Sequence, residues 1–478
     1  MPHSKCVFTA LVLFLTACSQ TQVPINSNIK LPAQFEQVKA GQAQNMQQWW
    51  QYWHDAQLAS LIEQGLKNSP DIAIAQSRLN EARAIAQLAQ SDLGPNVGIG
   101  GNIGGQRSQI NNPIDEPYRT LLGQDDHINS KGYGANVGVM ASWEVDIFGQ
   151  KKSDSDAASA AARGAQARVY GSQMMLTTAI AENYLNAAYT LEQRSTLTAM
   201  ATTLRKLQQY VKGRFEAGQV TAYEVSEVEA KLHAVQAQAM SLNAQFSAYE
   251  RSIAVLIGQT PQAFQLDRRV LLGQHSLLNR LPLPPTGVQP SQLLDYRPDI
   301  QGKKAAVDAY AAKLASAKAD LLPRFDIRFL GQGGRIELDG DLPTLKGIGG
   351  LVSVGVQLPL FTNGRIQANI DAADARLKTA LLEYDQTLLR TLSEVESSYQ
   401  LQYALIAQAQ KLQSAVVLAK RQATQGNRLF SYGEKTLDHA LRARLDALDL
   451  EQKMLELQLA KGQNLLNLYK AIGAGWQR

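Results

Sequence analysis

The sequence predicts a membrane-associated protein of long α-helices and a few β-strands, built from two homologous halves. Three observations predict this fold class: a long-range internal repeat, runs in which apolar and polar residues alternate, and long helical tracts without proline. The chain has 478 residues, of which 45% are hydrophobic. No apolar run reaches the roughly 20 residues that a membrane-spanning helix needs. Any contact with a membrane must therefore be made in another way.

The internal repeat is seen in constant intervals between matching residues. One group recurs after 228 positions: Asp92 as Asp320, Pro70 as Pro298, Pro95 as Pro323 and Arg107 as Arg335. A second group recurs after 215 positions: Gly149 as Gly364, Tyr184 as Tyr399, Phe215 as Phe430, Gly218 as Gly433 and Gly258 as Gly473. The difference, 228 minus 215, gives the first copy 13 extra residues before Gly149. A unit of roughly 200 residues that occurs twice indicates two fused halves, because solenoid repeats span about 20 to 50 residues.

The N-terminus has the features of a secretory signal. Lys5 precedes an apolar stretch, Val7–Leu15, and the stretch runs into the sequence LTAC, which ends at Cys18. This ending looks like the bacterial lipobox, in which the cysteine becomes the lipidated first residue of the mature chain. We expect residues 1–17 to be the signal peptide and Cys18 to carry N-acyl and diacylglycerol lipid. Ser19, which follows the cysteine, resembles that of lipoproteins sent to the outer membrane.

Residues 18–68 are expected to form a lipidated N-terminal segment that packs along the helices. This segment contains a tryptophan cluster at Trp49, Trp50 and Trp53. The cluster has two interpretations, a ligand-binding aromatic box or a set of anchors that hold the segment against the helices. We favour the anchors.

Each half contains two runs with alternating apolar and polar residues, which predict strands. The predicted strands cover about 94–107 and 134–147 in the first copy, and about 322–337 and 348–361 in the second. A tilted strand of this length can cross a bilayer, although a half-buried soluble sheet shows the same alternation. In a bilayer the sheet must close, because unpaired edge groups are costly in hydrocarbon. Known membrane barrels have at least about 8 strands, so four strands must share a barrel with other copies of the chain.

Long helical tracts follow the strands in both copies. Lys151–Phe215 contains no proline and would reach roughly 100 Å as one helix. Turns, which we call tips, are expected near 212–220 and 430–436. Each returning helix carries apolar residues at steps of three and four, as in a coiled-coil seam. In the second copy two seams indicate neighbours on both sides, as in a ring of helices.

These features divide the chain into successive regions. The first structural repeat covers residues 69–258 and the second covers 297–473, each with a helix, two strands, a long helix, a tip and a returning helix. Residues 259–296 form a proline-rich connector, and 474–478 form a C-terminal tail.

With these features the sequence resembles the outer-membrane efflux protein family, TolC-like, in its lipoprotein branch. The resemblance covers nearly the whole mature chain, and its carriers are Leu15–Cys18, Trp49–Ala84, Ser142–Gln150, Tyr296–Ile300 (YRPDI), Leu358–Gly364 and Ile472–Trp476. It implies a homotrimer with a shared 12-stranded barrel and a long periplasmic helical tunnel, lipid-anchored in the outer membrane of a Gram-negative bacterium. The implied function is the exit duct of a tripartite resistance-nodulation-division type efflux system. Its implied partners are a periplasmic adaptor and an inner-membrane transporter, and its implied cargo is small toxic compounds.

Composition and motifs argue against other classes of function. The net charge of +5 and the pI near 8.9 come from scattered basic residues, which disfavours nucleic acid as a partner. Cys6 would leave with the signal and Cys18 would be lipidated, which excludes a disulfide framework and a thiolate metal site. The six His show no metal-ligand spacing, and the motifs of nucleotide, zinc-protease or serine-hydrolase sites are missing. We therefore expect no enzyme activity, metal or cofactor.

Two alternative functions remain compatible with part of the sequence. A duct for a type I protein secretion system would have the same fold, because the pump selects the cargo. A periplasmic coiled-coil adaptor would explain the helices and the lipid, but it would not explain four bilayer-length strands or the duplication.

The resemblance also assigns a role to the tips, on which the family docks its adaptor. Gly218 and Gly433 are placed to end the long helices, since glycine accepts the left-handed C-cap conformation. Thr221 and Thr436 are placed to begin the returning helices as N-caps. These four residues are the predicted adaptor contacts.

The family often has acidic residues six and nine positions after the second tip glycine, where they line the periplasmic mouth. Here these positions hold His439 and Arg442, with Asp438 just before them. The equivalent positions in the first copy hold Glu224 and Glu227, and all five residues are candidates for the gate.

Two expectations follow for these candidates. Thr221 to Glu224 spells the T-x-x-E capping box, which gives Glu224 a structural role instead. If Arg442 lines the mouth, three copies place three positive charges in a narrow constriction that disfavours cations. The channel is then expected to be less cation-selective than relatives with the acidic pair.

Overall fold

The fold is known from a computed structural model, which describes residues 27, 29–38, 41, 46–273, 276–338 and 344–476. The predicted signal peptide and Cys18 lie outside the described residues. The described chain divides into two compact units. The strand unit contains residues 82–162 and 306–381, and the helical unit contains residues 27–81, 163–305 and 382–476.

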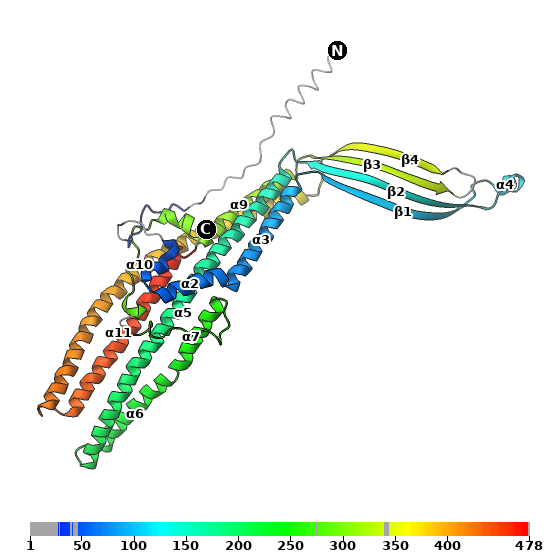
Figure 1. The fold of residues 1–478 in the computed structure, drawn as a ribbon. Helices are drawn as coiled ribbons and strands as arrows, with labels where there is room; N and C mark the ends of the chain where they lie inside the picture. Colours follow the sequence, from blue (N-terminus) through cyan, green and yellow to red (C-terminus); the bar gives the residue numbers. More distant parts are fainter. Residues whose placement is uncertain are drawn as a thin grey trace. The chain divides into compact units, whose positions relative to one another are not determined.

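The strand unit contains one antiparallel sheet with the strand order β1-β2-β3-β4 (Figure 1). Its strands are β1 (Asn96–Asn111), β2 (His127–Val145), β3 (Arg324–Leu338) and β4 (Leu345–Gln357). β1 and β2 extend further into their connection than predicted, and a short helix, α4 (Glu116–Leu122), lies between them. β4 ends at Gln357 rather than near residue 361, because Pro359 has no N–H to donate to a neighbouring strand.

The register of the sheet separates two chemically different faces. Ile99 lies opposite Val139, and Phe329 lies opposite Val352. Because side chains alternate along each strand, most of the branched and aromatic residues collect on one side, which we call the apolar face, while Met140, Leu330 and Leu351 lie on the other. It includes Val97, Ile99, Ile103, Val137, Val139, Trp143, Ile327, Phe329, Ile348, Val352, Val354 and Val356. The polar face includes Gly98, Gly100, Asn102, Gly104, Asn136, Gly138, Ser142, Gln332, Gly334, Gly347, Gly349 and Ser353.

The helices repeat in length between the two copies. α3 (Pro70–Ser91) and α9 (Pro298–Ala319) each have 22 residues, and α5 (Gln150–Glu216) and α10 (Arg365–Ser431) each have 67 residues. Within the described part of the chain, no helix combines the length and the apolar character that crossing a membrane requires.

The returning helices differ between the copies. The second copy has one continuous helix, α11 (Leu437–Ala471), whereas the first has α6 (Ala222–Met240) and α7 (Leu242–Leu256). The single returning helix expected in the first copy is therefore wrong. At the break, the Ser241 N–H bonds to the Ala239 carbonyl and its hydroxyl bonds to the Gln238 carbonyl. Such local serine bonds compete with the regular helical pattern.

Glycines at matching positions show that the two halves share backbone geometry. Gly258 has φ +74° and Gly473 has φ +79°, a conformation that glycine adopts without steric cost. A Cβ added to Gly258 would lie 2.5 Å from the carbonyl oxygen of Asn68. A Cβ added to Gly473 would come even closer to the carbonyl oxygen of Tyr296. In each copy the last turn thus packs against the residues just before the first helix of the repeat, which is α3 or α9.

The core of the helical unit holds the tryptophan cluster. Trp49, Trp50 and Trp53 are at most 1% exposed, and the Trp49 ring stacks on Tyr469 of α11 with centroids 4.9 Å apart. The three tryptophans belong to a short 3-10 helix, η1 (Met46–Trp53), which precedes α2 (Ala56–Asn68). The anchor interpretation is confirmed, because the rings pack into the core and leave no open aromatic box.

Upstream of η1, the N-terminal segment is bound to α10 by polar contacts. The Ser27 hydroxyl donates to Asp385 at 2.5 Å. The Glu396 carboxylate accepts the backbone N–H groups of Glu36 and Gln37 at 2.7 and 3.2 Å. The connector after α7 contains the short helices η3 (Leu277–Asn279), η4 (Pro290–Gln292) and α8 (Leu293–Tyr296).

Candidate functional site

The first tip joins α5 to α6 through a tight glycine turn. Gly218 has φ +68°, and its N–H donates to the Phe215 carbonyl at 2.9 Å. The following N–H, of Gln219, donates to the Arg214 carbonyl at 2.8 Å. These bonds satisfy carbonyls at the end of α5, as a left-handed C-cap does.

Thr221 and Glu224 begin α6 as a capping box. The Thr221 hydroxyl accepts the Tyr223 N–H at 3.2 Å, and the Glu224 carboxylate accepts the Thr221 N–H at 3.0 Å. The Thr221 hydroxyl also bonds to Glu224, and this bond holds the pKa of the Glu224 carboxyl below its usual range. The carboxylate of Glu224 is thus bound to Thr221 at the N-terminus of its own helix.

The second tip repeats the glycine turn between α10 and α11. Gly433 has φ +77°, and its N–H donates to the Phe430 carbonyl at 2.9 Å. Thr436 is the N-cap of α11 and accepts the His439 N–H at 3.4 Å. His439 occupies the place that Glu224 has in the first copy, so this tip has an N-cap but no capping-box carboxylate.

Behind the tips, a charged cluster connects α6 with α11. Arg442 Nε donates to Asp438 Oδ1 at 2.9 Å, and Arg442 Nη1 lies 3.7 Å from Glu227 Oε1. Glu227 also accepts a hydrogen bond from Lys231 at 2.6 Å. The hydrogen bond from Lys231, with the nearby Arg442 charge, lowers the pKa of the Glu227 carboxyl. We call Glu227, Lys231, Asp438 and Arg442 the bridging cluster.

The structure therefore brings together three of the five gate candidates. Glu227, Asp438 and Arg442 form one network, whereas Glu224 is bound to its cap. The His439 side chain is exposed. Arg442 faces two carboxylates, so its positive charge is locally balanced.

An apolar seam supports the bridging cluster. Val228 and Leu232 of α6 pack against α5, and Leu441 and Leu445 of α11 pack against the same group. The cluster thus lies beside the contact between the two helical hairpins, where a change in their separation would act on the ion pair.

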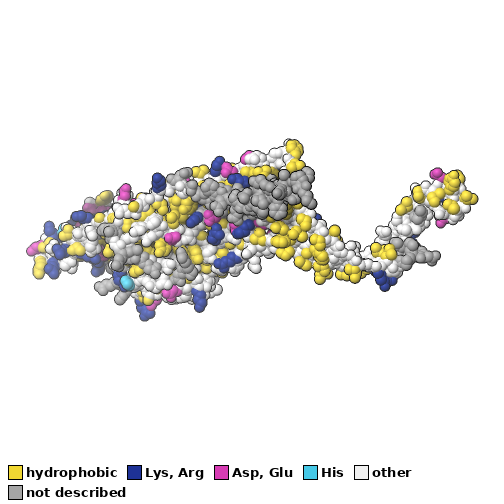
Figure 2. All heavy atoms as spheres, turned by 90° about the horizontal axis from the view of Figure 1, so that it is seen from above, with side chains coloured by type: hydrophobic (Ala, Val, Ile, Leu, Met, Phe, Trp, Pro, Cys, Tyr) yellow, Lys and Arg dark blue, Asp and Glu magenta, His cyan; other side chains and the backbone are white. Residues whose placement is uncertain are grey.

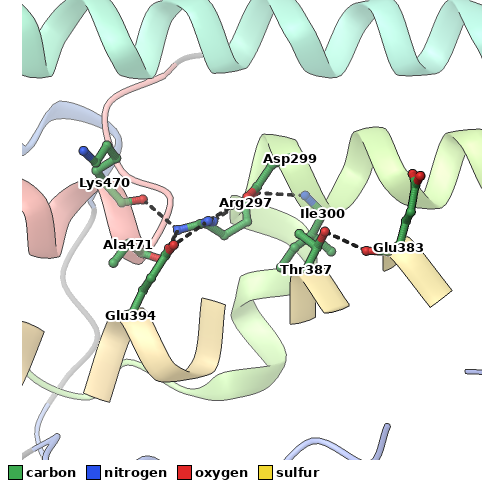
Figure 3. Close-up of polar contacts among 8 residues, drawn as sticks. All are labelled: Arg297, Asp299, Ile300, Glu383, Thr387, Glu394, Lys470 and Ala471. Atoms are coloured by element: carbon green, nitrogen blue, oxygen red, sulfur yellow. Dashed lines mark hydrogen bonds and ion pairs between the residues drawn. The ribbon is translucent and has the colours of Figure 1, made fainter. Parts of the chain in front are cut away.

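Arg297 forms a second polar junction, which the sequence analysis did not identify as functional. Its guanidinium donates to Asp299 at 2.9 and 2.6 Å and to Glu394 at 3.2 and 3.3 Å. It also donates to the carbonyls of Lys470 and Ala471 at 3.3 and 2.9 Å, at the end of α11 (Figure 3).

This junction ties together three helices of the second copy. Arg297 is 6% exposed and precedes α9, while its partners come from α9, α10 and α11. The motif YRPDI contains the available sequence clue, an arginine directly before a helix whose first turn holds Asp299. The equivalent residue of the first copy is Ser69, so the junction occurs in one half only.

Among the described residues, no group of three or more His, Cys, Asp or Glu side chains is placed to hold a metal ion. The candidate site therefore consists of the two tips and the bridging cluster. Its turns are exposed, and the ion pair between Arg442 and Glu227 connects α11 with α6.

The chain is similar to proteins of export and efflux systems. It is 26% identical over 469 residues to the pyoverdine export outer membrane protein OpmQ of Pseudomonas aeruginosa, covering 97% of this chain and 95% of the relative. It is 24% identical over 494 residues to the cation efflux system protein CusC of Escherichia coli K12, covering 99% of this chain and 100% of CusC.

Solved structures share the fold. The outer-membrane channel OprN superposes with a TM-score of 0.78 at 21% identity, covering 96% of this chain and 100% of OprN. The open-state MtrE channel of Neisseria gonorrhoeae has a TM-score of 0.78 at 20% identity, covering 96% and 98% of the two chains. The family model described as outer membrane efflux protein matches residues 61–259 and 289–474. This chain is a member of the outer membrane efflux protein family.

Proposed function

We propose that three copies of this chain form the outer-membrane exit duct of a tripartite efflux pump, which passes small toxic compounds to the cell exterior. The observation that carries this proposal is the four-stranded sheet, with one exposed apolar face and two open edges. A soluble sheet would cover such a face with other elements of its fold, and a periplasmic adaptor has no use for it.

The exposed side chains of the apolar face support contact with lipid. Ile348 is 96% exposed and Ile99 is 79% exposed in the single chain. A contiguous exposed apolar surface of this kind marks an interaction with protein or membrane. Hydrocarbon is the occupant that fits an outer-membrane protein.

The edges of the sheet support assembly. β1 and β4 each have one neighbour in the single chain, and unpaired backbone groups in hydrocarbon cost several kcal/mol each. Pairing β1 of one copy with β4 of the next removes both edges. Three copies then give a closed barrel of twelve strands, the number that the family resemblance implies.

The polar face would line the duct. Between Asn96 and Gly104 of β1 it carries glycine and asparagine, and the charged residues of this face lie on β2 and β3 at Glu144, Arg324, Asp326 and Arg328. These two acids and two arginines give this face no net charge, which fits export of varied solutes. The relatives' names differ in cargo, since they refer to pyoverdine export, cation efflux and multidrug resistance, so the pump rather than the duct would select the cargo.

The tips and the bridging cluster would serve docking and gating. Gly218, Thr221, Gly433 and Thr436 would present the turns to a periplasmic adaptor, which connects to an inner-membrane transporter. Glu227, Asp438 and Arg442 would hold the two hairpins together in the closed duct. Lipid on Cys18 would anchor the chain in addition to the barrel, because several acyl chains exceed the two-signal requirement for stable anchoring.

A combined experiment tests this function. The purified protein is run unboiled and boiled on a gel, and a channel-deletion strain is complemented and scored for efflux of toxic compounds. We expect a heat-sensitive trimer and restored resistance. A species that stays monomeric and soluble when Cys18→Ser blocks lipidation would contradict the barrel.

A further inference from the structure

The two tips carry different charge, although they occupy equivalent places in the duplicated chain. The window 205–231 around the first tip holds five Lys or Arg and four Asp or Glu, a net charge of +1. The equivalent window 420–446, displaced by 215 positions, holds six and three, a net charge of +3. The whole chain has a net charge of +5, so this short window carries a large part of it.

Half of the cations in the second window have carboxylate partners. Lys420 and Arg444 approach Glu451 at 3.3 and 3.9 Å, and Arg442 belongs to the bridging cluster. The other three, Arg421, Arg428 and Lys435, have exposed side chains and no carboxylate partner among the described residues. We call these three residues the basic patch.

The basic patch faces away from the packing between α10 and α11. Ala419 of α10 is buried with Ala447 of α11, and Gly426 approaches the Ala440 Cα. Arg421 and Arg428 each follow one of these seam residues by two positions, which is about 200° around the helix. They therefore lie on the outer surface of α10.

The basic patch is continuous with the second tip. Arg428 lies one turn before the end of α10 at Ser431, Arg421 lies about 15 Å from that end, and Lys435 is in the turn itself. Figure 2 shows Lys and Arg side chains at the tip end of the helical unit as well as along its length. Glu434 is the nearby exposed acidic residue in the same turn.

The first copy does not repeat this patch at the equivalent places, although Lys212 and Arg214 lie close to its tip. The residues equivalent to Arg428 and Lys435 are Gly213 and Val220, and only Arg421 has a basic equivalent, Lys206. The fold therefore does not require cations at these places. Cations without carboxylate partners repel one another. An acidic surface that covers them would be attracted to them and would offset this repulsion.

We propose that the basic patch is a docking surface for an acidic segment of the periplasmic adaptor, and that it gives the second tip its specificity for that partner. This inference rests on the proposed function, because it concerns the partner expected at the tips. Charge complementarity of this kind acts mainly on the association rate and on the choice of partner.

The test measures binding of the adaptor to purified trimers at low and high salt. The probe is the periplasmic adaptor from the same genome, identified by its ability to restore efflux together with this channel. We expect the triple variant Arg421→Glu, Arg428→Glu, Lys435→Glu to associate at least about tenfold more slowly at low salt. The wild-type rate should fall with salt, and the variant's rate should not.

A matched control and a compensating variant make the result specific. Arg390→Glu reverses one exposed cation of the same helix, about 46 Å from Arg421, and should bind like wild type. Replacing the acidic residues of the adaptor's docking loop with Lys should restore binding to the triple variant. Trimer formation on an unboiled gel excludes misfolding as the cause.

The outcomes separate this inference from the proposed function. If the triple variant binds at the wild-type rate while Gly433→Val loses binding, docking at the tip stands and the charge inference is wrong. An adaptor whose docking loop lacks acidic residues would also overturn the inference. If neither variant affects binding, the adaptor docks elsewhere and the proposed role of the tips fails.

Discussion

Glu227 and Arg442 occupy equivalent positions in the two copies, 215 residues apart, and they have opposite charges. In the structure they lie 3.7 Å from each other, across the contact between α6 and α11. Two identical copies would place like charges here, which repel. After a duplication, equivalent positions can thus change to opposite charges. The two halves then form an ion pair with each other that identical copies could not form.

The same divergence separates Arg297 from its equivalent, Ser69. Arg297 makes hydrogen bonds to Asp299, Glu394 and two carbonyls of α11. The Ser69 hydroxyl is buried and has no hydrogen-bond partner among the described residues. The second copy is thus fixed at one end by a polar junction that the first copy lacks.

Replacing Arg297 with the residue of the first copy should have the largest effect. Arg297→Ser removes a buried cation and leaves two carboxylates and two helix-terminal carbonyls without their donor. We expect a loss of about 2 kcal/mol in the free energy of unfolding, seen as a lower melting temperature of the detergent-solubilised protein. Ser69→Ala is the matched control and should change the melting temperature little. A similar effect of both variants would show that the junction adds nothing beyond packing.

Valine at the tip glycines should compare the two turns directly. Gly218 and Gly433 both have positive φ and open space around the position of a Cβ, so the strain comes from the backbone alone and costs roughly 1–2 kcal/mol. We expect assembled trimers with reduced adaptor crosslinking in both variants, and a larger loss of resistance for Gly433→Val. An equal or larger loss for Gly218→Val would contradict the unequal roles of the tips.

Reversing the charge at Arg442 should act on the duct rather than on the fold. Arg442→Asp places an acid beside Glu227 and Asp438, which should loosen the hairpin contact. We expect higher conductance in planar bilayers and a shift toward cations in reversal potentials. The double variant Glu227→Arg, Arg442→Glu should recover part of the low conductance, with a coupling of about 0.2–1 kcal/mol typical of exposed pairs. No change in Arg442→Asp would place this side chain outside the gate.

The pH dependence of conductance should show the smallest effect. The pKa of the Glu227 carboxyl is lowered by Lys231 and Arg442. The ionised carboxylate therefore stabilises the contact between the hairpins fully above the unfolded pKa of about 4.3. That contribution is lost as the pH falls through the lower, folded pKa. We expect flat conductance between about pH 5 and 7 and an increase in stronger acid, which Glu227→Gln should remove. An increase already near neutral pH would assign gating to another group.

The sequence by itself determined the duplication, the strands and the tip turns. Alternation such as Val137, Val139 and Ala141 has the period of a strand, and Gly218 and Gly433 mark helix ends through their own backbone freedom. The strand and tip signals are local, because each depends on residues within a few positions of one another, whereas the duplication is read from intervals of 215 and 228 positions. The same reasoning missed the break at Ser241, where a side-chain bond interrupts a continuous apolar pattern.

Tertiary structure decided which charged residues meet. Arg297 pairs with Glu394, and Arg442 pairs with Glu227, across separations that no local period describes. From the sequence, Arg442 could line the duct or face a neighbouring helix. Helix periodicity shows which residues share a face with Arg442, but it does not show what that face contacts. The packing of α6 against α11 made that choice, because an ion pair forms only where two opposite charges approach within about 4 Å.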